Sequence, residues 1–106
     1  MGGRTAAETL AAFDASLAGD TPPADLSGPL RALWHAARGD WDKAHDAVQD
    51  DESAAATWVH AHLHRQEGDL PNARYWYSRA GKTMPVLPVE QERRSIIQQL
   101  IAASAR

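Results

Sequence analysis

Three histidines stand at alternate positions in the segment WVHAHLHR, which covers residues 58–65. On a helix, His60 and His64 lie one turn apart on the same side, which is the spacing that lets two imidazoles reach one zinc ion. His62 projects from another side of that helix. His35, which occupies the equivalent place in a similar segment earlier in the chain, is a third candidate ligand. The histidines therefore define an alternative metal site of His35, His60 and His64.

A structural role for these histidines is the favoured interpretation. The sequence has no glutamate between His60 and His64, as a metalloprotease helix has, and no further ligand stands at a convincing spacing. Buried polar groups are nearly always hydrogen-bonded, so we expect a neighbouring carbonyl or carboxylate to satisfy the His64 ring between packed helices. We accordingly predict no cofactor and no metal as the primary assignment.

Signals for catalysis are missing from the rest of the sequence. There is no cysteine to act as a nucleophile. Serines such as Ser27 and Ser53 stand at expected helix caps rather than in the strand–turn–helix elbow of a hydrolase. His45 and Asp46 are adjacent but point about 100° apart on a helix, which predicts a solvent-exposed face. The chain is therefore predicted not to be an enzyme.

Composition and charge describe one acidic domain of 106 residues, with 43% apolar residues, 24% charged residues and a net charge of −3. Residues 1–53 hold four Lys/Arg against ten Asp/Glu, whereas residues 54–106 hold seven against four. An acidic chain is a poor ligand for nucleic acid. No apolar run approaches the ~20 residues of a membrane span, and no signal segment opens the chain. We expect a cytoplasmic protein without nucleic-acid or membrane partners.

Helix-forming signals predict an all-α fold with about six helices and no strand. Ala is abundant, β-branched residues are few, and cap residues recur along the chain. Thr5 and Glu8, for example, form a capping-box pattern. The expected helices begin after Thr5, Ser27, Asp40, Ser53 and Asp69 and near Pro88.

The apolar positions of the last two predicted helices indicate which sides are buried. The predicted stripe of the fifth helix is Leu70, Ala73, Tyr77 and Ala80. The last helix has an apolar side formed by Ile96, Ile97, Leu100 and Ile101, with Glu90, Glu92, Arg93, Gln98 and Gln99 on its polar sides. Arg74, Arg79 and Lys82 avoid the stripe of the fifth helix and are expected in solvent.

A repeat of 29 residues links the two halves of the chain. Gly39 aligns with Gly68, Asp40 with Asp69, and Ala44 with Ala73. The glycine supplies the left-handed residue that ends one helix, and the aspartate caps the next. Each segment is therefore a predicted helix–turn–helix unit that must stack on a neighbour. The predicted organisation is residues 1–24 (N-terminal helix and linker), 25–53 (first unit), 54–85 (second unit) and 86–106 (C-terminal capping helix).

The second unit resembles a tetratricopeptide repeat. Gly68, Ala73, Tyr77, Ala80 and Pro85 match the Gly, Ala, aromatic, Ala and Pro of that family's signature. The first unit keeps only its glycine and one alanine, and the offset of 29 is shorter than the ~34 residues of a standard repeat. The segment HRQEGDLPNARYWYSRAG is also similar to one in small bacterial proteins without an established activity. The resemblance implies antiparallel helix–turn–helix repeats in a right-handed superhelix.

Tetratricopeptide folds line a concave groove with the first helix of each unit, and this resemblance implies a partner-binding surface here. The matching positions are Trp58, His62, Arg65 and Gln66 in the second unit and Leu33 in the first. This groove has an apolar part and a polar, basic part. Such a surface suits a peptide with an apolar anchor and an acidic end, because Arg65 can fork onto a carboxylate. We therefore predict a non-catalytic protein–protein interaction module that binds a peptide or helix of an acidic partner.

Two alternatives remain open at this stage. The first is a small histidine-based metal- or ligand-binding protein that uses His35, His60 and His64. The second is a self-associating structural protein, because the acidic front half and the basic rear half of the chain can attract each other between copies.

Overall fold

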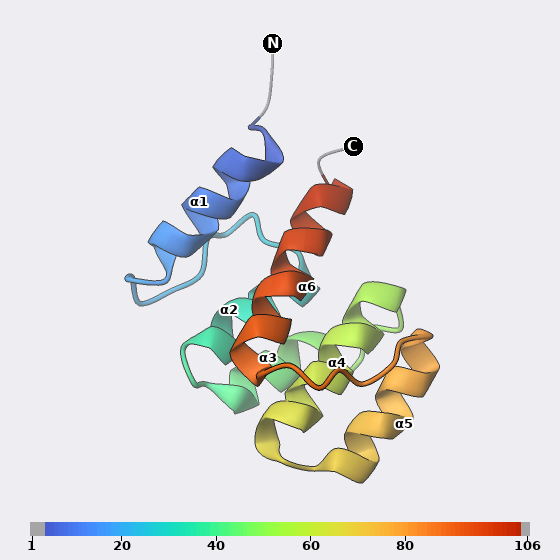
Figure 1. Cartoon of the computed structure of the whole chain (residues 1–106). Helices are drawn as coiled ribbons and strands as arrows, with labels where there is room; N and C mark the ends of the chain where they lie inside the picture. The colour runs from blue at the N-terminus through green and yellow to red at the C-terminus, as the bar shows by residue number, and fades with distance from the viewer. Residues whose placement is uncertain (1–3, 105–106) are drawn as a thin grey trace.

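The computed structural model describes residues 4–104, which form six α-helices and no strand (Figure 1). This confirms the all-α prediction. The helices are α1 (Ala6–Ser16), α2 (Gly28–Ala37), α3 (Trp41–Val48), α4 (Ala54–Glu67), α5 (Leu70–Ala80) and α6 (Val89–Ser104).

The predicted caps begin the first five helices. Thr5 and Glu8 form a reciprocal capping box at α1, with a Thr5 N to Glu8 Oε1 distance of 2.8 Å. Ser27 and Ser53 each accept a backbone N–H in the first turn of α2 and α4. Because a cap satisfies backbone donors that have no partner inside the helix, these helix starts are set by local sequence.

The two helix–turn–helix units share one corner geometry. Gly39 and Gly68 follow α2 and α4 with φ values of 80° and 89°, a conformation that favours glycine. Asp40 and Asp69 come next, with φ and ψ of −98° and 80° in one and −88° and 78° in the other. Each aspartate donates its N–H to the carbonyl five residues earlier, at 2.9 and 3.0 Å. The repeated Gly-Asp pair thus ends one helix and starts the next in both units.

The helices pack around a core centred on α2, α4 and α6. α2 packs against α3, and α4 packs against α5. α6 lies against α1, α2 and α4, and the segment of residues 81–88 crosses α4 before α6 begins (Figure 1). Leu33 and Trp34 of α2, Leu63 of α4 and Ile96 of α6 are fully buried together. The apolar side predicted for the last helix therefore faces the two units.

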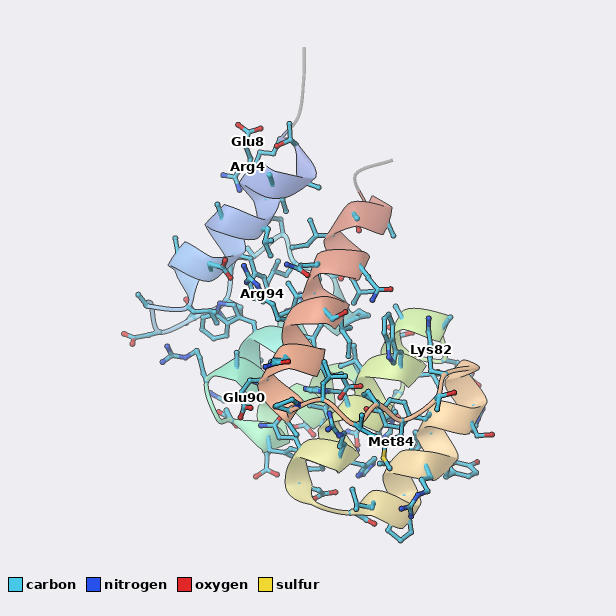
Figure 2. The ribbon with its side chains drawn as sticks, viewed as in Figure 1. Arg4, Glu8, Lys82, Met84, Glu90 and Arg94 are labelled. Carbon is cyan, nitrogen blue, oxygen red and sulfur yellow. The ribbon has the colours of Figure 1, made fainter. Side chains whose placement is uncertain are left out.

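An ion pair joins α6 to α1 on the opposite side of α6 from the second unit. Arg94 points from α6 toward α1 (Figure 2), and its guanidinium forks onto Asp14, with an Nη2–Oδ2 distance of 2.8 Å. Both side chains are about two-fifths exposed to solvent. None of the helices in residues 4–104 is both long enough and apolar enough to cross a membrane.

Three sequence-based burial assignments are wrong. Leu70 is 40% exposed, although it belongs to the predicted stripe of α5. Its equivalent, Trp41, bonds to Leu63 of α4, whereas no third unit follows α5 in the described chain to cover Leu70. Glu92 is 4% exposed instead of lying on a polar side, and His45 is half-buried instead of solvated. Both of these side chains meet partners from other helices.

Candidate functional site

The three histidines of α4 serve two different polar clusters. His62 points to one side of the helix, whereas His60 and His64 point to another, as expected for residues two and four positions apart. All three are buried: the exposed fraction is 0% for His62, 6% for His60 and 7% for His64. The two clusters differ in chemistry, because one is centred on a carboxylate and the other on imidazoles.

The first cluster surrounds the carboxylate of Glu92 on α6 and is called the Glu92 cluster. His62 Nδ1 is 2.8 Å from Glu92 Oε1, and Arg65 Nη1 donates to the same oxygen at 3.0 Å. The hydroxyl of Tyr77 on α5 donates to Oε2. Both carboxylate oxygens are thereby bonded, so the cluster joins α4, α5 and α6 through one buried acid.

The ionisation of the Glu92 cluster follows from these bonds. Burial by itself raises the pKa of Glu92, but hydrogen bonds from His62, Tyr77 and Arg65 outweigh it and lower the pKa below its usual value. Burial raises the pKa of Tyr77 far above its usual value, and the bond to the carboxylate adds to this rise. The stable state of the cluster is therefore a carboxylate held by a neutral phenol and a guanidinium.

The predicted partner-binding residues lie beneath α6 and the segment before it. Leu33 and His62 are fully buried, and Arg65 donates to the Leu87 carbonyl in addition to Glu92. Gln66 is half-buried and donates to the Ala36 carbonyl at 3.3 Å. The sequence-based picture of an open groove is therefore wrong for these residues. The physical reason is that α6 has an apolar side that must be buried. It packs against the face of the two units that carries these residues, and each surface covers the other.

Trp58, one of the five predicted contact residues, lines a pocket. This pocket has a volume of about 160 Å³ and lies between α4, the 81–88 segment and α6, with Pro85 and Ile96 among its walls. Lys82 also lines this pocket (Figure 2), and its Nζ lies 4.2 Å from the centre of the Trp58 ring. Trp58 therefore marks the part of the groove that α6 leaves unfilled.

The second cluster consists of His45, His60 and His64 and is called the imidazole cluster. His45 Nε2 on α3 is 3.0 Å from His60 Nε2 on α4. The His60 and His64 rings stack with centroids 4.8 Å apart. One ring nitrogen from each of the three residues lies within 4.8 Å of the others. Three imidazoles from two helices thus converge on one point.

Two tryptophans flank the imidazole cluster. Trp41 stacks on His45 with ring centroids 4.8 Å apart, and Trp76 of α5 stacks on His60 at 4.0 Å. The Trp41 indole also donates to the Leu63 carbonyl at 2.6 Å, which fixes its position between α3 and α4. Flat stacking of this kind restricts the imidazole rotamers, so the rings are held in place.

A carboxylate orients the third imidazole. His64 Nδ1 is 2.7 Å from Glu67 Oε2, one turn further along α4. This confirms the prediction that a neighbouring acceptor satisfies the buried His64 ring. The amide nitrogen of Asn72 on α5 lies 3.4 Å from His64 Nε2. Nδ1 of His64 is thus bonded to Glu67, and Nε2 faces the amide of Asn72.

The electrostatics of the imidazole cluster disfavour protonation at its centre. Burial lowers the pKa of His60 to about 4, and the neighbouring charges of His45 and His64 push in the same direction. A neutral imidazole has one nitrogen with a free lone pair, which can accept a proton or bind a metal. At neutral pH His60 therefore offers such a nitrogen to its surroundings.

The imidazole cluster borders a pocket with a volume of about 340 Å³. His60 and Trp76 form its inner wall. Its outer edge carries the acidic residues at 50–52, which connect α3 to α4, and Arg79 of α5 lies opposite them. The pocket therefore places three acidic side chains and one arginine in the same hollow as His60.

The structure changes the membership of the predicted histidine site. His60 and His64 come together, but His35 packs edge-on against Trp34 with centroids 5.2 Å apart and is not part of the cluster. His45 takes its place because α3 packs against α4. Sequence reasoning missed both His45 and Glu92, since they lie 15 and 30 residues from their partners and no local spacing reports such contacts.

Comparison of this chain with family models, with curated proteins and with solved structures finds no match.

Proposed function

We propose that this protein is a non-catalytic protein–protein interaction domain built on two tetratricopeptide-like units. Its groove binds a partner helix that has an apolar side and one carboxylate, at the place where α6 lies in the isolated chain. The observation that carries the proposal is the seating of Glu92 on His62, Arg65 and Tyr77.

The chemistry of the seated helix supports a helix-in-groove mode of recognition. α6 presents Ile96, Ile97 and Ile101 to the core, each no more than 3% exposed, and one buried acid to a guanidinium. An apolar stripe provides affinity, and a single paired charge fixes the register of a helix along a groove. A partner helix with the same pattern meets the same contacts.

The repeat geometry supports the tetratricopeptide-like assignment. The Gly-Asp corners after α2 and α4 have matching dihedral angles, and Ala44 and Ala73 at equivalent positions are both 0% exposed. A small buried residue at this position lets the two helices of a unit approach closely. The two units therefore offer their first helices, α2 and α4, as a continuous face.

The connection before α6 favours exchange of this helix with a partner. Residues 82–88 contain no helix, and Pro85 and Pro88 prevent the segment from continuing α5. Val86 is fully exposed. A helix joined through one irregular segment can leave its groove without disturbing the caps of α2 to α5. The intramolecular helix then acts as a competitor that sets the apparent affinity for the partner.

The experiment is a titration of the full-length chain with a fluorescent peptide of residues 89–104, followed by anisotropy. Wild type holds its own α6 and is expected to bind the peptide weakly. An E92Q chain weakens the internal competitor, so we expect its apparent affinity for the wild-type peptide to rise by at least about tenfold. E90Q is the matched control, because Glu90 is exposed on the same helix (Figure 2).

The peptide variant provides the reciprocal test. A peptide that carries E92Q is expected to bind the E92Q chain about tenfold more weakly than the wild-type peptide, because Arg65 then lacks its carboxylate. No binding of either peptide to the E92Q chain means that α6 is a permanent part of the core, and the proposed interaction function is then wrong.

A further inference from the structure

We propose that His45, His60 and His64 bind one transition-metal ion of the zinc class, which lies at the point where their ring nitrogens converge. This site is independent of the groove beneath α6, because it lies on the other side of α4 and uses no residue of the Glu92 cluster. It also replaces the histidine set expected from the sequence, since His45 takes the place of His35.

The distances between the rings fit the demands of a small divalent ion. Zinc–nitrogen bonds of about 2.0–2.1 Å in a tetrahedral site place neighbouring ligand nitrogens about 3.4 Å apart. His45 Nε2 and His60 Nε2 are 3.0 Å apart, and one nitrogen of His64 lies within 4.8 Å of both. The spacing of His45 and His60 is therefore already close to that of two zinc ligands, and the nitrogen of His64 lies within reach of the same ion.

The donor set selects the class of metal. Three imidazoles suit Zn²⁺, Cu²⁺, Ni²⁺ or Fe²⁺, whereas Ca²⁺ and Mg²⁺ prefer oxygen ligands. Three protein ligands leave a fourth tetrahedral position open, as in zinc sites that keep a bound water or an exchangeable ligand. The 340 Å³ pocket beside His60 offers room for such a ligand.

The surroundings of the cluster resemble those of a prepared metal site. Glu67 bonds to His64 Nδ1 at 2.7 Å, which is the carboxylate–histidine arrangement that orients a ligand and raises its basicity. Trp41 and Trp76 hold the other two rings by stacking. The acidic edge at residues 50–52 attracts cations toward the pocket. Orientation, rigidity and access are therefore supplied by separate parts of the chain.

A second donor set shares one residue with the imidazole cluster. His64, Glu67 and Asp69 also bring ligand atoms within 4.8 Å of one another, but both acids are exposed. Asp69 already accepts the Asn72 N–H as the cap of α5. Glu67 acts in our proposal through His64 and not on the metal. The two assignments differ in whether His45 or Asp69 is required.

The experiment measures Zn²⁺ binding to the full-length chain, without a histidine tag and after chelator treatment, by competition with a chromophoric chelator. Co²⁺ serves as a spectroscopic probe, because a four-coordinate site gives much stronger visible absorption than an octahedral one. We expect one ion per chain and the intense four-coordinate spectrum. A hexa-aqua-like Co²⁺ spectrum, or binding weaker than the chelator can report, overturns the proposal.

Substitutions assign the ligands. H45Q and H64Q are expected to lower the Zn²⁺ affinity by more than about 100-fold, and E67Q by about 10- to 100-fold, which is the range for a partner that orients a ligand. H35Q is the matched control and is expected to change the affinity less than twofold. If D69N weakens binding while H45Q does not, the metal belongs to the carboxylate set, and the imidazole site is wrong.

Ring-nitrogen NMR spectra of the wild-type chain keep the test valid if a variant unfolds. Zn²⁺ is expected to shift the ring signals of His45, His60 and His64 and to leave those of His35 and His62 unchanged. Shifts confined to His64, or spread evenly over all five histidines, contradict the assignment. Because the peptide titration of the groove requires no metal, failure of either proposal is visible without the other.

Discussion

The Glu92 cluster and the imidazole cluster take side chains from α4 that are only one or two positions apart in the sequence. They differ in how their polar atoms are satisfied. In the Glu92 cluster a buried acid receives bonds from three different side chains on two helices. In the imidazole cluster three bases face one another, and the acid that contacts them reaches only His64. In the Glu92 cluster both oxygens of the acid have partners, although the buried His62 Nε2 has none, whereas the imidazole cluster has a surplus of lone pairs at its centre.

This difference separates a stabilising network from a candidate binding site. A buried acid whose two oxygens are both bonded holds helices together, and its loss leaves the charge of its partner uncompensated. A group of facing imidazoles in which only His64 is bonded to an acid gains little from its own contacts. Completion by a cation from outside the chain is therefore reasonable for the imidazole cluster and unnecessary for the Glu92 cluster.

The largest expected effect is the loss of the central acid. E92A leaves Arg65, His62 and Tyr77 without their common acceptor, so the free energy of unfolding is expected to fall by about 3–5 kcal/mol. Urea-induced unfolding followed by circular dichroism measures this change. The exposed neighbour serves as control, because E90A is expected to change the value by less than about 0.5 kcal/mol. A loss below 1 kcal/mol for E92A would contradict the stabilising role of the network.

Acid is expected to act on the two clusters in different pH ranges. In metal-free protein His60 has a native pKa of about 4 and an unfolded value near 6.5, so its protonation favours the unfolded chain. The stability it contributes is complete above pH 6.5 and is lost as the pH falls toward 4, by up to about 3 kcal/mol. The lowered pKa of Glu92 acts further down, because its contribution is complete above about 4.5 and is lost below.

Unfolding curves from pH 7.5 to 3.5, measured with a chelator present, test this separation. H60L is expected to flatten the curve between pH 6.5 and 4, whereas E92Q flattens it only at the acidic end. An H60L curve parallel to that of wild type over the upper range would show that His60 is not the group responsible.

Replacement of a central imidazole by an apolar side chain gives a smaller expected effect without metal. H60L keeps a similar volume and removes only the His60 side of the contact with His45, so the free energy of unfolding in chelator should change by less than about 1.5 kcal/mol. With Zn²⁺ present, wild type is expected to gain stability and H60L is not. A cost for H60L comparable to that of E92A would show that both clusters are stabilising networks, which removes the contrast.

The smallest expected effect concerns the exposed tether of α6. Arg94 and Asp14 join α6 to α1, and both side chains are about two-fifths exposed. Exposed ion pairs contribute only about 0–1 kcal/mol in most proteins. R94Q is therefore expected to lower the free energy of unfolding by about 1 kcal/mol or less. Raising the salt concentration should diminish this difference, because exposed charges are screened. The same unfolding assay applies. A larger and salt-independent loss would show that α6 depends on its contact with α1 more than on Glu92.

Local signals made the helices predictable. The caps at Thr5, Ser27 and Ser53 and the Gly-Asp pairs act within one helical turn, so each start could be assigned from neighbouring residues. The errors arose where a residue meets a distant helix. Leu70 belongs to the predicted stripe by spacing alone, yet burial also requires a neighbouring helix, and no helix within residues 4–104 covers it.

The candidate sites were predictable only in part. The convergence of His60 and His64 follows from the helical period, and the apolar side of the last helix follows from its isoleucines. The position of that helix over the predicted groove could not be predicted. An apolar side indicates that the helix is buried against another surface, but it does not identify that surface. The predicted groove was consequently expected to be open, whereas α6 covers it in the isolated chain.

The sequence by itself determined six helices, their caps, the repeated corner and one pair of imidazoles, because all of these depend on residues within a few positions of one another. Only the tertiary structure decided that His45 supplies the third imidazole and that Glu92 completes the contacts of His62 and Arg65. The physical reason is the same in both cases. Which side chains meet across helices depends on how whole helix faces pack, and that is settled by burial summed over the entire chain.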